Sequence, residues 1–235
     1  MSRRPADRSV AEAFSACLFV LAFFSSCAGQ PSPSAGAVIQ GSRFSLRLVP
    51  GPSYRFVSWA SIFPIAIYPQ VACWLETPQG EYVDTIYVTS KSSKKSWVSA
   101  PPVGRPEALP VWSHLAKARS PAVDAVTGAT PAGATLRTSS LASALPSGTY
   151  IVKLEVNRSY DYNDTYTRAN SGVTGQPSLV YKCALDVGHG PRKGTFEPIG
   201  TGAVDGSDGA IRPGLGGVTT ALRILAAAEI SSGMD

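Results

Sequence analysis

The chain has 235 residues, and its 21 Lys and Arg against 16 Asp and Glu give a formal net charge of +5. A chain of this length can bury a sizeable core as a single domain. The basic excess is small and does not form a stripe with interleaved aromatic residues, which excludes nucleic-acid binding from the expected functions. The two histidines have no ligand-like neighbours at helical or turn spacing, so the sequence holds no zinc-site pattern.

Residues 1–26 are predicted to form a lipoprotein signal peptide. Three arginines precede an apolar run over residues 13–24, which is too short to span a bilayer. Two serines then precede Cys27, and a polar Pro/Ser-rich stretch follows at 28–36. This arrangement resembles a bacterial lipoprotein processing site of the relaxed kind found in spirochaetes. We therefore expect lipidation of Cys27, with an ordinary signal peptide and an incidental cysteine as the alternative.

Lipidation would fix the location of the protein. Removal of the signal peptide leaves 209 residues (235 minus 26) with 18 basic and 14 acidic side chains. Acyl chains such as palmitate on Cys27 would hold this chain to a membrane, at the periplasmic face or the cell surface, with its body in extracytoplasmic water. Residues 27–40 are predicted to be a flexible tether, and residues 41–235 a single folded domain.

The body of the chain alternates short strand-like runs with long connections rich in Gly, Pro and Ser. The runs lie at 43–49, 70–77, 81–90, 149–159 and 177–187, and the run at 221–230 fits a strand or a short helix. The residues Pro78–Gly80 have hairpin-turn chemistry. Between 149 and 159, alternation places Tyr150, Val152, Leu154 and Val156 on one face.

The remaining runs give little helix. The only helical signal lies at 107–119, where Pro110 is expected to interrupt it. The most apolar run, 56–69, is broken by Pro64 and is predicted to form buried strands. These patterns together predict an all-β fold, an immunoglobulin-like β-sandwich with long Gly/Pro-rich loops.

Cys73 and Cys183 each lie in a strand-like run. An extracytoplasmic compartment permits a disulfide between them. Two buried free thiols are the alternative, because cysteine packs well as a small apolar side chain.

Several segments resemble a known family when they are taken in order. They are QVACWLETPQGEYVDTIYVT (70–89), RPEALPVW (105–112), VDAVTGATP (123–131) and LPSGTYIVKLEVNRSYDYN (145–163), extended by GQPSLVY (175–181). Together they resemble the predicted periplasmic family called domain of unknown function 2271. The resemblance implies an immunoglobulin-like sandwich similar to domains of flagellar hook-capping proteins. It implies no particular activity.

The segment DAVTGATP (124–131) is similar to the acceptor motif of proteins that carry covalent flavin mononucleotide (FMN). In that motif a flavin transferase joins the flavin phosphate to the last threonine, here Thr130. Gly128 and Ala129 keep the segment slim, and Asp124 and Thr127 complete the motif. The alternative is a turn closed by the Asp124 and Thr127 side chains. No cofactor is expected otherwise, and FMN is the candidate that this motif supplies.

Two loops carry oxygen-rich side chains that could hold Ca²⁺. They supply Asp161, Asn163, Asp164, Asp205 and Asp208, without the helix–loop–helix calcium pattern. Hydrated turns are the alternative. The neighbouring tyrosines, Tyr160, Tyr162 and Tyr166, could instead form a binding surface.

No catalytic constellation is present in the sequence. The chain lacks a Gly-x-Ser-x-Gly elbow and an acid–histidine pairing, so we expect no enzyme. The leading interpretation is a lipid-anchored, non-catalytic binding or structural module that meets an unknown protein partner through loops at one end of the sandwich. The alternative is an extracytoplasmic electron carrier with FMN on Thr130.

Overall fold

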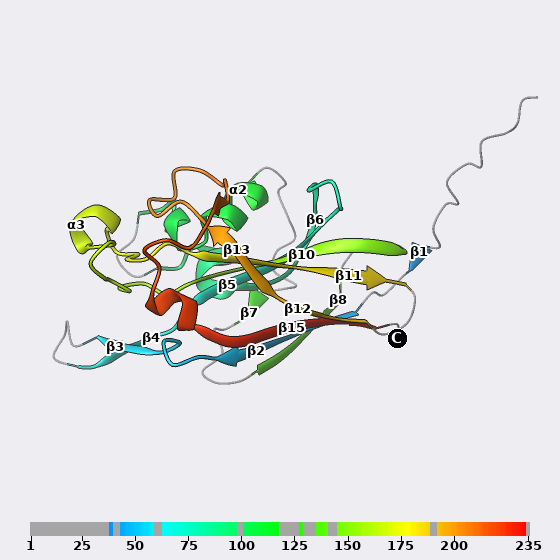
Figure 1. Ribbon diagram of the computed structural model, residues 1–235, viewed down its shortest axis with the longest axis horizontal. Coiled ribbons are helices and arrows are strands. Elements are labelled where there is room, and N and C mark those ends of the chain that lie inside the picture. The colour runs from blue at the N-terminus through cyan, green and yellow to red at the C-terminus, as the bar shows by residue number, and fades with distance from the viewer. Residues whose placement is uncertain are drawn as a thin grey trace, which may run out of the picture. The chain divides into compact units, whose positions relative to one another are not determined.

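The computed structural model describes residues 38–39, 43–58, 63–97, 101–117, 127–128, 135–140, 145–188 and 192–233, which all belong to the unit Gly36–Asp235. Most of these residues lie in strands (Figure 1). The strands pair antiparallel, except that β6 and β7 run parallel. The prediction of a mostly β fold is therefore confirmed.

The larger sheet has the strand order β14–β13–β11–β10–β5–β6–β7. Its strands are β5 (Gln70–Glu76), β6 (Tyr82–Thr89), β7 (Thr127–Gly128), β10 (Gly148–Asn157), β11 (Leu179–Val187), β13 (Glu197–Thr201) and β14 (Arg212–Pro213). The smaller sheet, ordered β12–β15–β2–β8, contains β2 (Arg43–Pro50), β8 (Thr135–Ser140), β12 (Arg192–Thr195) and β15 (Leu225–Gly233).

Two short strand pairs and several helices complete the described part of the chain. The pairs are β1 (Val38–Ile39) with β9 (Leu145–Pro146), and β3 (Phe56–Ser58) with β4 (Ile65–Ile67). The helices are α1 (Ser90–Lys94), η1 (Pro106–Ala108), α2 (Pro110–Lys117), α3 (Arg168–Ser171) and η3 (Thr220–Arg223). None of the helices in these ranges is long and apolar enough to cross a membrane.

The inner faces of the two sheets share one hydrophobic cluster. In β10, the predicted alternation is confirmed: Tyr150, Val152, Leu154 and Val156 are all buried in this cluster. The smaller sheet contributes the side chains of β2 and β15 to it, and β5 and β11 contribute from either side of β10. Burial of apolar surface at about 25 cal/mol per Å² makes this shared cluster the main source of stability.

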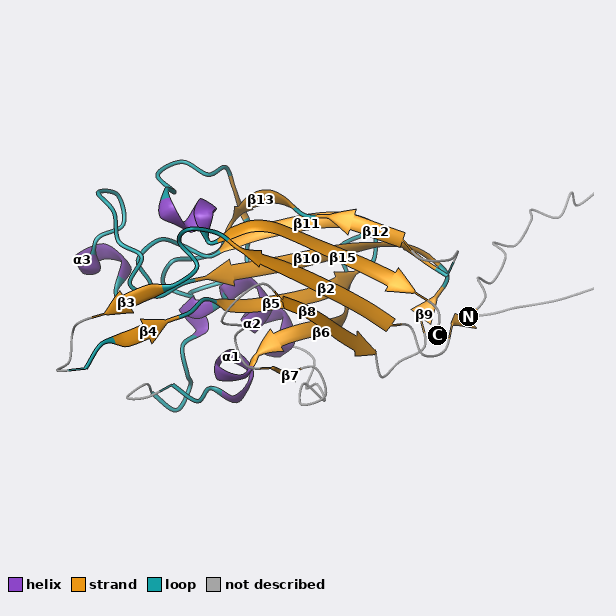
Figure 2. Cartoon of the chain, turned by 90° about the horizontal axis from the view of Figure 1, so that it is seen from below, coloured by secondary structure: helices purple, strands orange, loops and turns teal. Residues whose placement is uncertain are grey.

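The opposite face of the larger sheet is covered by α2 (Figure 2), where a second cluster includes Trp74, Val180, Val111 and Trp112. An eight-residue helix is not stable alone in water, so its docking on the sheet decides whether it forms. The residue that fixes the docking is Glu155, which projects from β10 to this face and is completely buried.

The Glu155 carboxylate caps the start of α2. It accepts hydrogen bonds from the backbone N–H groups of Val111 (3.2 Å) and Trp112 (2.9 Å), and from the Ser178 hydroxyl (2.6 Å). These N–H groups belong to the first helical turn, which has no intrahelical acceptors. The close approach requires Gly202, because a Cβ atom there would lie 2.5 Å from both Pro110 Cγ and Ser178 Oγ.

Two predictions from the sequence are wrong. Pro110 begins α2 instead of interrupting a helix, because the first helical position needs no N–H donor. The run at 56–69 contains the strands β3 and β4, but its large apolar side chains within 56–58 and 63–68 are not buried: Phe63 is 70% exposed and Ile65 is 55% exposed. The 221–230 run contains the end of η3 and most of β15, so both alternatives for it occur.

The buried Glu155 predicts a pH-dependent stability. Burial raises the pKa of Glu155 from 4.5 to about 7, although its three hydrogen-bond donors act to lower it. Between these values the folded protein retains a proton that the unfolded chain has released. The free energy of unfolding should therefore fall as the pH rises from about 4.5 to about 7. A pKa difference of this size corresponds to a total decrease of about 3 kcal/mol.

Urea unfolding of the wild type and Glu155→Gln, from about pH 4 to pH 8, measures this contribution. The difference in stability, wild type minus variant, should decrease between about pH 4.5 and pH 7 and stay constant above pH 7. A difference that is independent of pH would contradict the assignment.

Candidate functional site

Three loop segments lie together at the end of the domain away from β1, as both ribbon views show (Figures 1 and 2). They are the β3–β4 hairpin, the 158–176 segment that carries α3, and the 215–224 segment that carries η3. We call this region the loop end.

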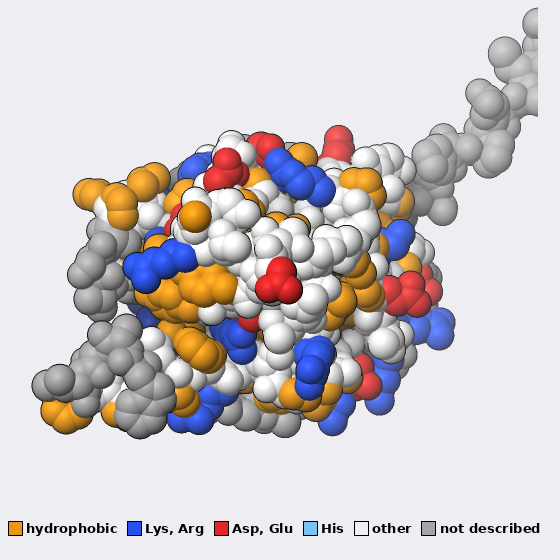
Figure 3. All heavy atoms as spheres, turned by 60° about the vertical axis from the view of Figure 1, so that its left-hand side comes forward, with side chains coloured by type: hydrophobic (Ala, Val, Ile, Leu, Met, Phe, Trp, Pro, Cys, Tyr) orange, Lys and Arg blue, Asp and Glu red, His pale blue; other side chains and the backbone are white. Residues whose placement is uncertain are grey.

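Large apolar side chains are concentrated at the loop end. The exposed ones are Phe56, Phe63 and Ile65 on the hairpin, Tyr160 and Val173 near α3, and Leu222 on η3. Within the described ranges, Val103 is the one other large apolar residue in this class. Figure 3 brings this end forward and shows hydrophobic side chains next to Lys and Arg side chains. A group of exposed apolar side chains marks an interaction surface more often than single scattered ones do.

A buried polar network joins the α3 segment and the η3 segment to the turn that precedes β3. Arg158 is buried and donates hydrogen bonds to the Ser53 carbonyl and to Asp161 Oδ1, the latter at 2.5 Å. The same carboxylate oxygen accepts from the Thr220 hydroxyl (2.6 Å), which in turn accepts from the Gln176 amide (2.5 Å). The relative positions of the α3 segment, the η3 segment and the turn before β3 are thus fixed by charged and polar contacts out of water.

The surface above the network is also held in place. The Arg158 guanidinium lies 5.5 Å from the centre of the Phe56 ring, in a cation–π contact. Tyr160 has a left-handed backbone conformation (φ 62°), and its N–H donates to the Val173 carbonyl at 2.9 Å. A positive φ is unfavourable for a bulky residue, so tertiary contacts impose this conformation. Strain of this kind is concentrated at binding sites.

Four of the five predicted calcium ligands, Asp161, Asn163, Asp205 and Asp208, use at least one oxygen for contacts within the protein. Asp161 pairs with Arg158, and the Asn163 side-chain oxygen accepts the N–H groups of Thr165 and Tyr166. Asp205 Oδ1 accepts the N–H of Ser207, and Asp208 forms an exposed ion pair with Arg212. Asp164 is exposed beside them in the sequence. Across the part of the chain that the structure describes, no three His, Cys, Asp or Glu side chains come together as a metal site requires.

Only part of the flavin acceptor motif falls within the described residues. Thr127 and Gly128 form β7, which pairs with Val88 and Thr89 at the outer edge of the larger sheet. Asp124, Ala129 and Thr130 lie outside the described residues, as does Cys27. The described part of the motif therefore lies at a sheet edge, beside the end of β6 from which α1 starts.

The two cysteines of the folded domain are buried free thiols. Cys73 lies opposite Leu154, and Cys183 lies opposite Val152, so that β10 runs between them. Two strand spacings of about 4.8 Å each exceed the Cα separation of about 7 Å that a disulfide tolerates. Burial raises the pKa of both thiols, that of Cys183 to about 12, which keeps them protonated and unreactive.

Sequence reasoning did not find the residues that build the loop end. It named the tyrosines near α3, but it missed Arg158, Gln176 and the exposed hairpin. One signal for the hairpin was present: Pro64 sits between Phe63 and Ile65, and proline is excluded from central strands. No comparable signal marks Arg158, because its partners come from positions 53 and 161.

Residues 67–176 match the model of a family described as predicted periplasmic protein (DUF2271). No curated protein and no solved structure matches the chain. The family match confirms the resemblance found in the sequence, and the matched range includes β5, β6, α1, α2, β10 and α3. The family description points to the periplasm, and no function is established for the family.

The Arg158–Asp161 pair should be essential for the loop end to fold. Replacement of Arg158 by Met leaves the Asp161 carboxylate buried without its partner, which should lower the free energy of unfolding by about 3–5 kcal/mol. The matched control is Asp208→Asn in the exposed pair with Arg212, which should leave the urea midpoint unchanged. Equal effects of the two substitutions in urea unfolding would refute the role of the buried network.

Proposed function

We propose that this chain, whose central segment matches a family described as periplasmic, is a non-catalytic binding module that contacts a partner protein through its loop end. The observation that carries the proposal is the concentration of exposed large apolar side chains there, among them Phe63 and Ile65. Solvent-exposed apolar residues of this size are costly unless a partner covers them.

The composition of the loop end fits a protein partner. Aromatic residues and arginine are enriched at protein interfaces. Aromatic rings bury large areas with few rotatable bonds, and the arginine guanidinium forms several hydrogen bonds at once. Phe56, Phe63 and Tyr160 provide such side chains, and Arg55 and Arg223 are exposed on the same segments. The buried Arg158 network supports the proposal further, because a surface that is already ordered loses less conformational entropy on binding.

The proposal includes a membrane anchor and a fold assignment. Lipid on Cys27, joined through the tether at 27–40, would hold the module at an extracytoplasmic membrane surface. The cluster shared by the two sheets supports an immunoglobulin-like sandwich, in which loops at one end commonly carry the binding residues.

Crosslinking in the native host tests the binding surface. The double variant Phe63→Ser/Ile65→Ser should reduce the yield of crosslinked partner about tenfold, since anchor side chains at interfaces each contribute about 1 kcal/mol or more. The control is Val103→Ser, which removes an equally exposed apolar side chain away from the loop end and should leave the yield unchanged. A partner that is captured equally by all three proteins does not bind the loop end.

A second candidate function is an extracytoplasmic electron carrier with FMN on Thr130. The position of β7 favours it, because Thr127 and Gly128 lie at the outer edge of the sheet, where a flavin transferase can approach the segment that follows. The bond formed would join Oγ1 of Thr130 to the flavin phosphorus of a flavin dinucleotide, and a nucleoside monophosphate would leave. FMN would supply the electron transfer, and the chain would hold and orient it.

Intact-mass measurement tests this candidate on protein purified from the host or co-produced with a flavin transferase. A flavin-sized addition and yellow colour are expected for the wild type and for Thr130→Ser, which keeps the hydroxyl group. Both should be absent from Thr130→Ala. An unmodified wild-type mass would exclude the carrier function and leave residues 124–131 as a turn. The same spectra report the lipid on Cys27, which Cys27→Ala should abolish.

A further inference from the structure

A pocket of about 290 Å³ opens between α1 and α2, on the face of the larger sheet that α2 covers. Its walls come from α1 and the residue that follows it, from the 103–106 segment, and from one side of α2. No described residue of the loop end or of the flavin motif is among the lining residues, and the family match over 67–176 covers all the lining residues that the structure describes. The volume is at the lower end of the range for small-molecule sites, about 300–1,000 Å³.

The charge of the pocket is positive. Lys95, Arg105 and Lys117 line it, and no acidic side chain is found among its described lining residues. Arg105 is already engaged, because it donates to Glu107 at 3.0 Å and stacks over Trp97. Lys95 and Lys117 have no ion pair with any described residue. The pocket therefore presents two uncompensated ammonium groups.

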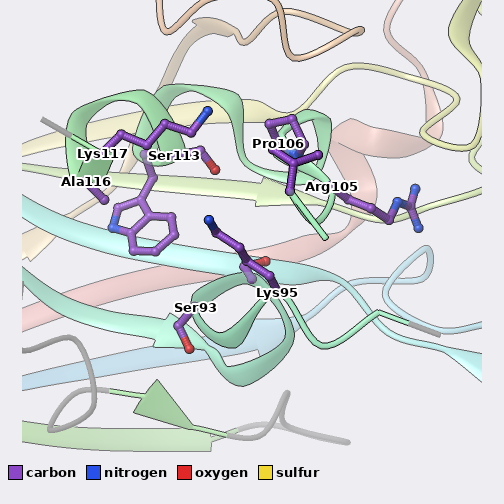
Figure 4. Close-up of a pocket in the computed structure, with 10 residues that line it drawn as sticks. Ser93, Lys95, Arg105, Pro106, Ser113, Ala116 and Lys117 are labelled. Atoms are coloured by element: carbon purple, nitrogen blue, oxygen red, sulfur yellow. The ribbon is translucent and has the colours of Figure 1, made fainter. Parts of the chain in front are cut away.

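Figure 4 shows where these groups point. The ammonium group of Lys95 and the hydroxyl group of Ser113 are directed into the space between α1 and α2, whereas the Lys117 side chain runs along α2 and the Arg105 guanidinium points away. The Ser113 hydroxyl has no hydrogen-bond partner among the described side chains, so it is available as a donor. Lys95, Ser113 and Lys117 all line the pocket and supply the ammonium and hydroxyl donors that an oxyanion requires.

The backbone holds Lys95 in this position. Lys95 ends α1 in the left-handed conformation (φ 52°), with its N–H donating to the Lys91 carbonyl. Its side chain packs against Gly104, where a Cβ atom would lie only 2.9 Å from Lys95 Cβ. Gly104 itself has φ +78°, a conformation that favours glycine. The missing side chain at 104 therefore leaves the room that the Lys95 stem occupies.

The remaining wall is apolar. Val103, Pro106 and Ala116 line it together with Trp112, whose ring nitrogen is already bonded to the Thr85 hydroxyl at 3.0 Å. A ligand that fits both the lysine-lined wall and the apolar wall has an anionic group that contacts the lysines and a small apolar group that packs on the apolar wall.

The geometry points to a binding site for a small organic phosphate monoester, with the phosphate between Lys95 and Lys117 and the apolar group against Val103 and Pro106. A phosphate monoester carries a charge of about −1.5 to −2 at pH 7, which the two unpaired ammonium groups match. The site is independent of the partner surface at the loop end. The pocket holds a ligand, and the loop end contacts a protein.

Calorimetric titration of the full domain with phenyl phosphate, inorganic phosphate and phenol tests the site. Phenyl phosphate should bind most tightly, inorganic phosphate more weakly because it lacks the apolar group, and phenol without measurable heat. Lys95→Met and Lys117→Met should each weaken phenyl phosphate about tenfold, as expected for the loss of one charge-assisted contact. Lys94→Met, on the same helix but outside the pocket, should bind like the wild type.

Vesicles of phosphatidylcholine, with and without phosphatidic acid, separate the two sources of such a group. Binding that requires phosphatidic acid and both lysines would identify a lipid headgroup, whereas binding of phenyl phosphate alone would identify a soluble ligand. Circular dichroism establishes that each variant is folded. The site is refuted if phenyl phosphate gives no binding up to about 10 mM, or if both lysine variants bind it as tightly as Lys94→Met.

Discussion

One buried carboxylate organises the face of this protein that carries its pocket. Glu155 projects from the central strand β10 and accepts the free N–H groups at the start of α2. That helix is too short to persist in water, so without this contact neither α2 nor the wall it contributes to the pocket would be fixed. The arrangement places a group of raised pKa at the centre of the sheet, and this makes part of the stability sensitive to pH.

Strand β10 also connects this face with the loop end. Its inward residues supply the shared core, and the residue after its last one, Arg158, enters the buried network under the exposed apolar surface. The pocket and the loop end therefore depend on one strand but use different chemistry. The pocket is lined by two ammonium groups without an ion pair among the described residues, whereas the loop end exposes aromatic and aliphatic side chains. A change at one site can be tested without disturbing the other.

The two proposed sites differ in how much of each lies within the segment that matches the family. All pocket residues lie within 67–176, and so do Arg158 and Asp161. The β3–β4 hairpin and η3 lie outside this range and provide much of the exposed apolar surface. The described pocket residues thus all lie in the matched segment, whereas the loop end also includes elements before and after that segment.

The sequence by itself determined the strands of the core, because alternation in β10 and the turn residues at Pro78–Gly80 are local signals. It also determined which segments carry polar oxygens and a possible flavin acceptor. Only the tertiary structure decided that Glu155 is a buried cap, that Asp161 is an ion-pair partner, and that Lys95 and Lys117 line one pocket. These roles depend on partners between 3 and 59 positions away in the chain, and no local periodicity encodes such a pairing. The hairpin shows the same limit, since apolar composition cannot distinguish a buried strand from one exposed for a partner.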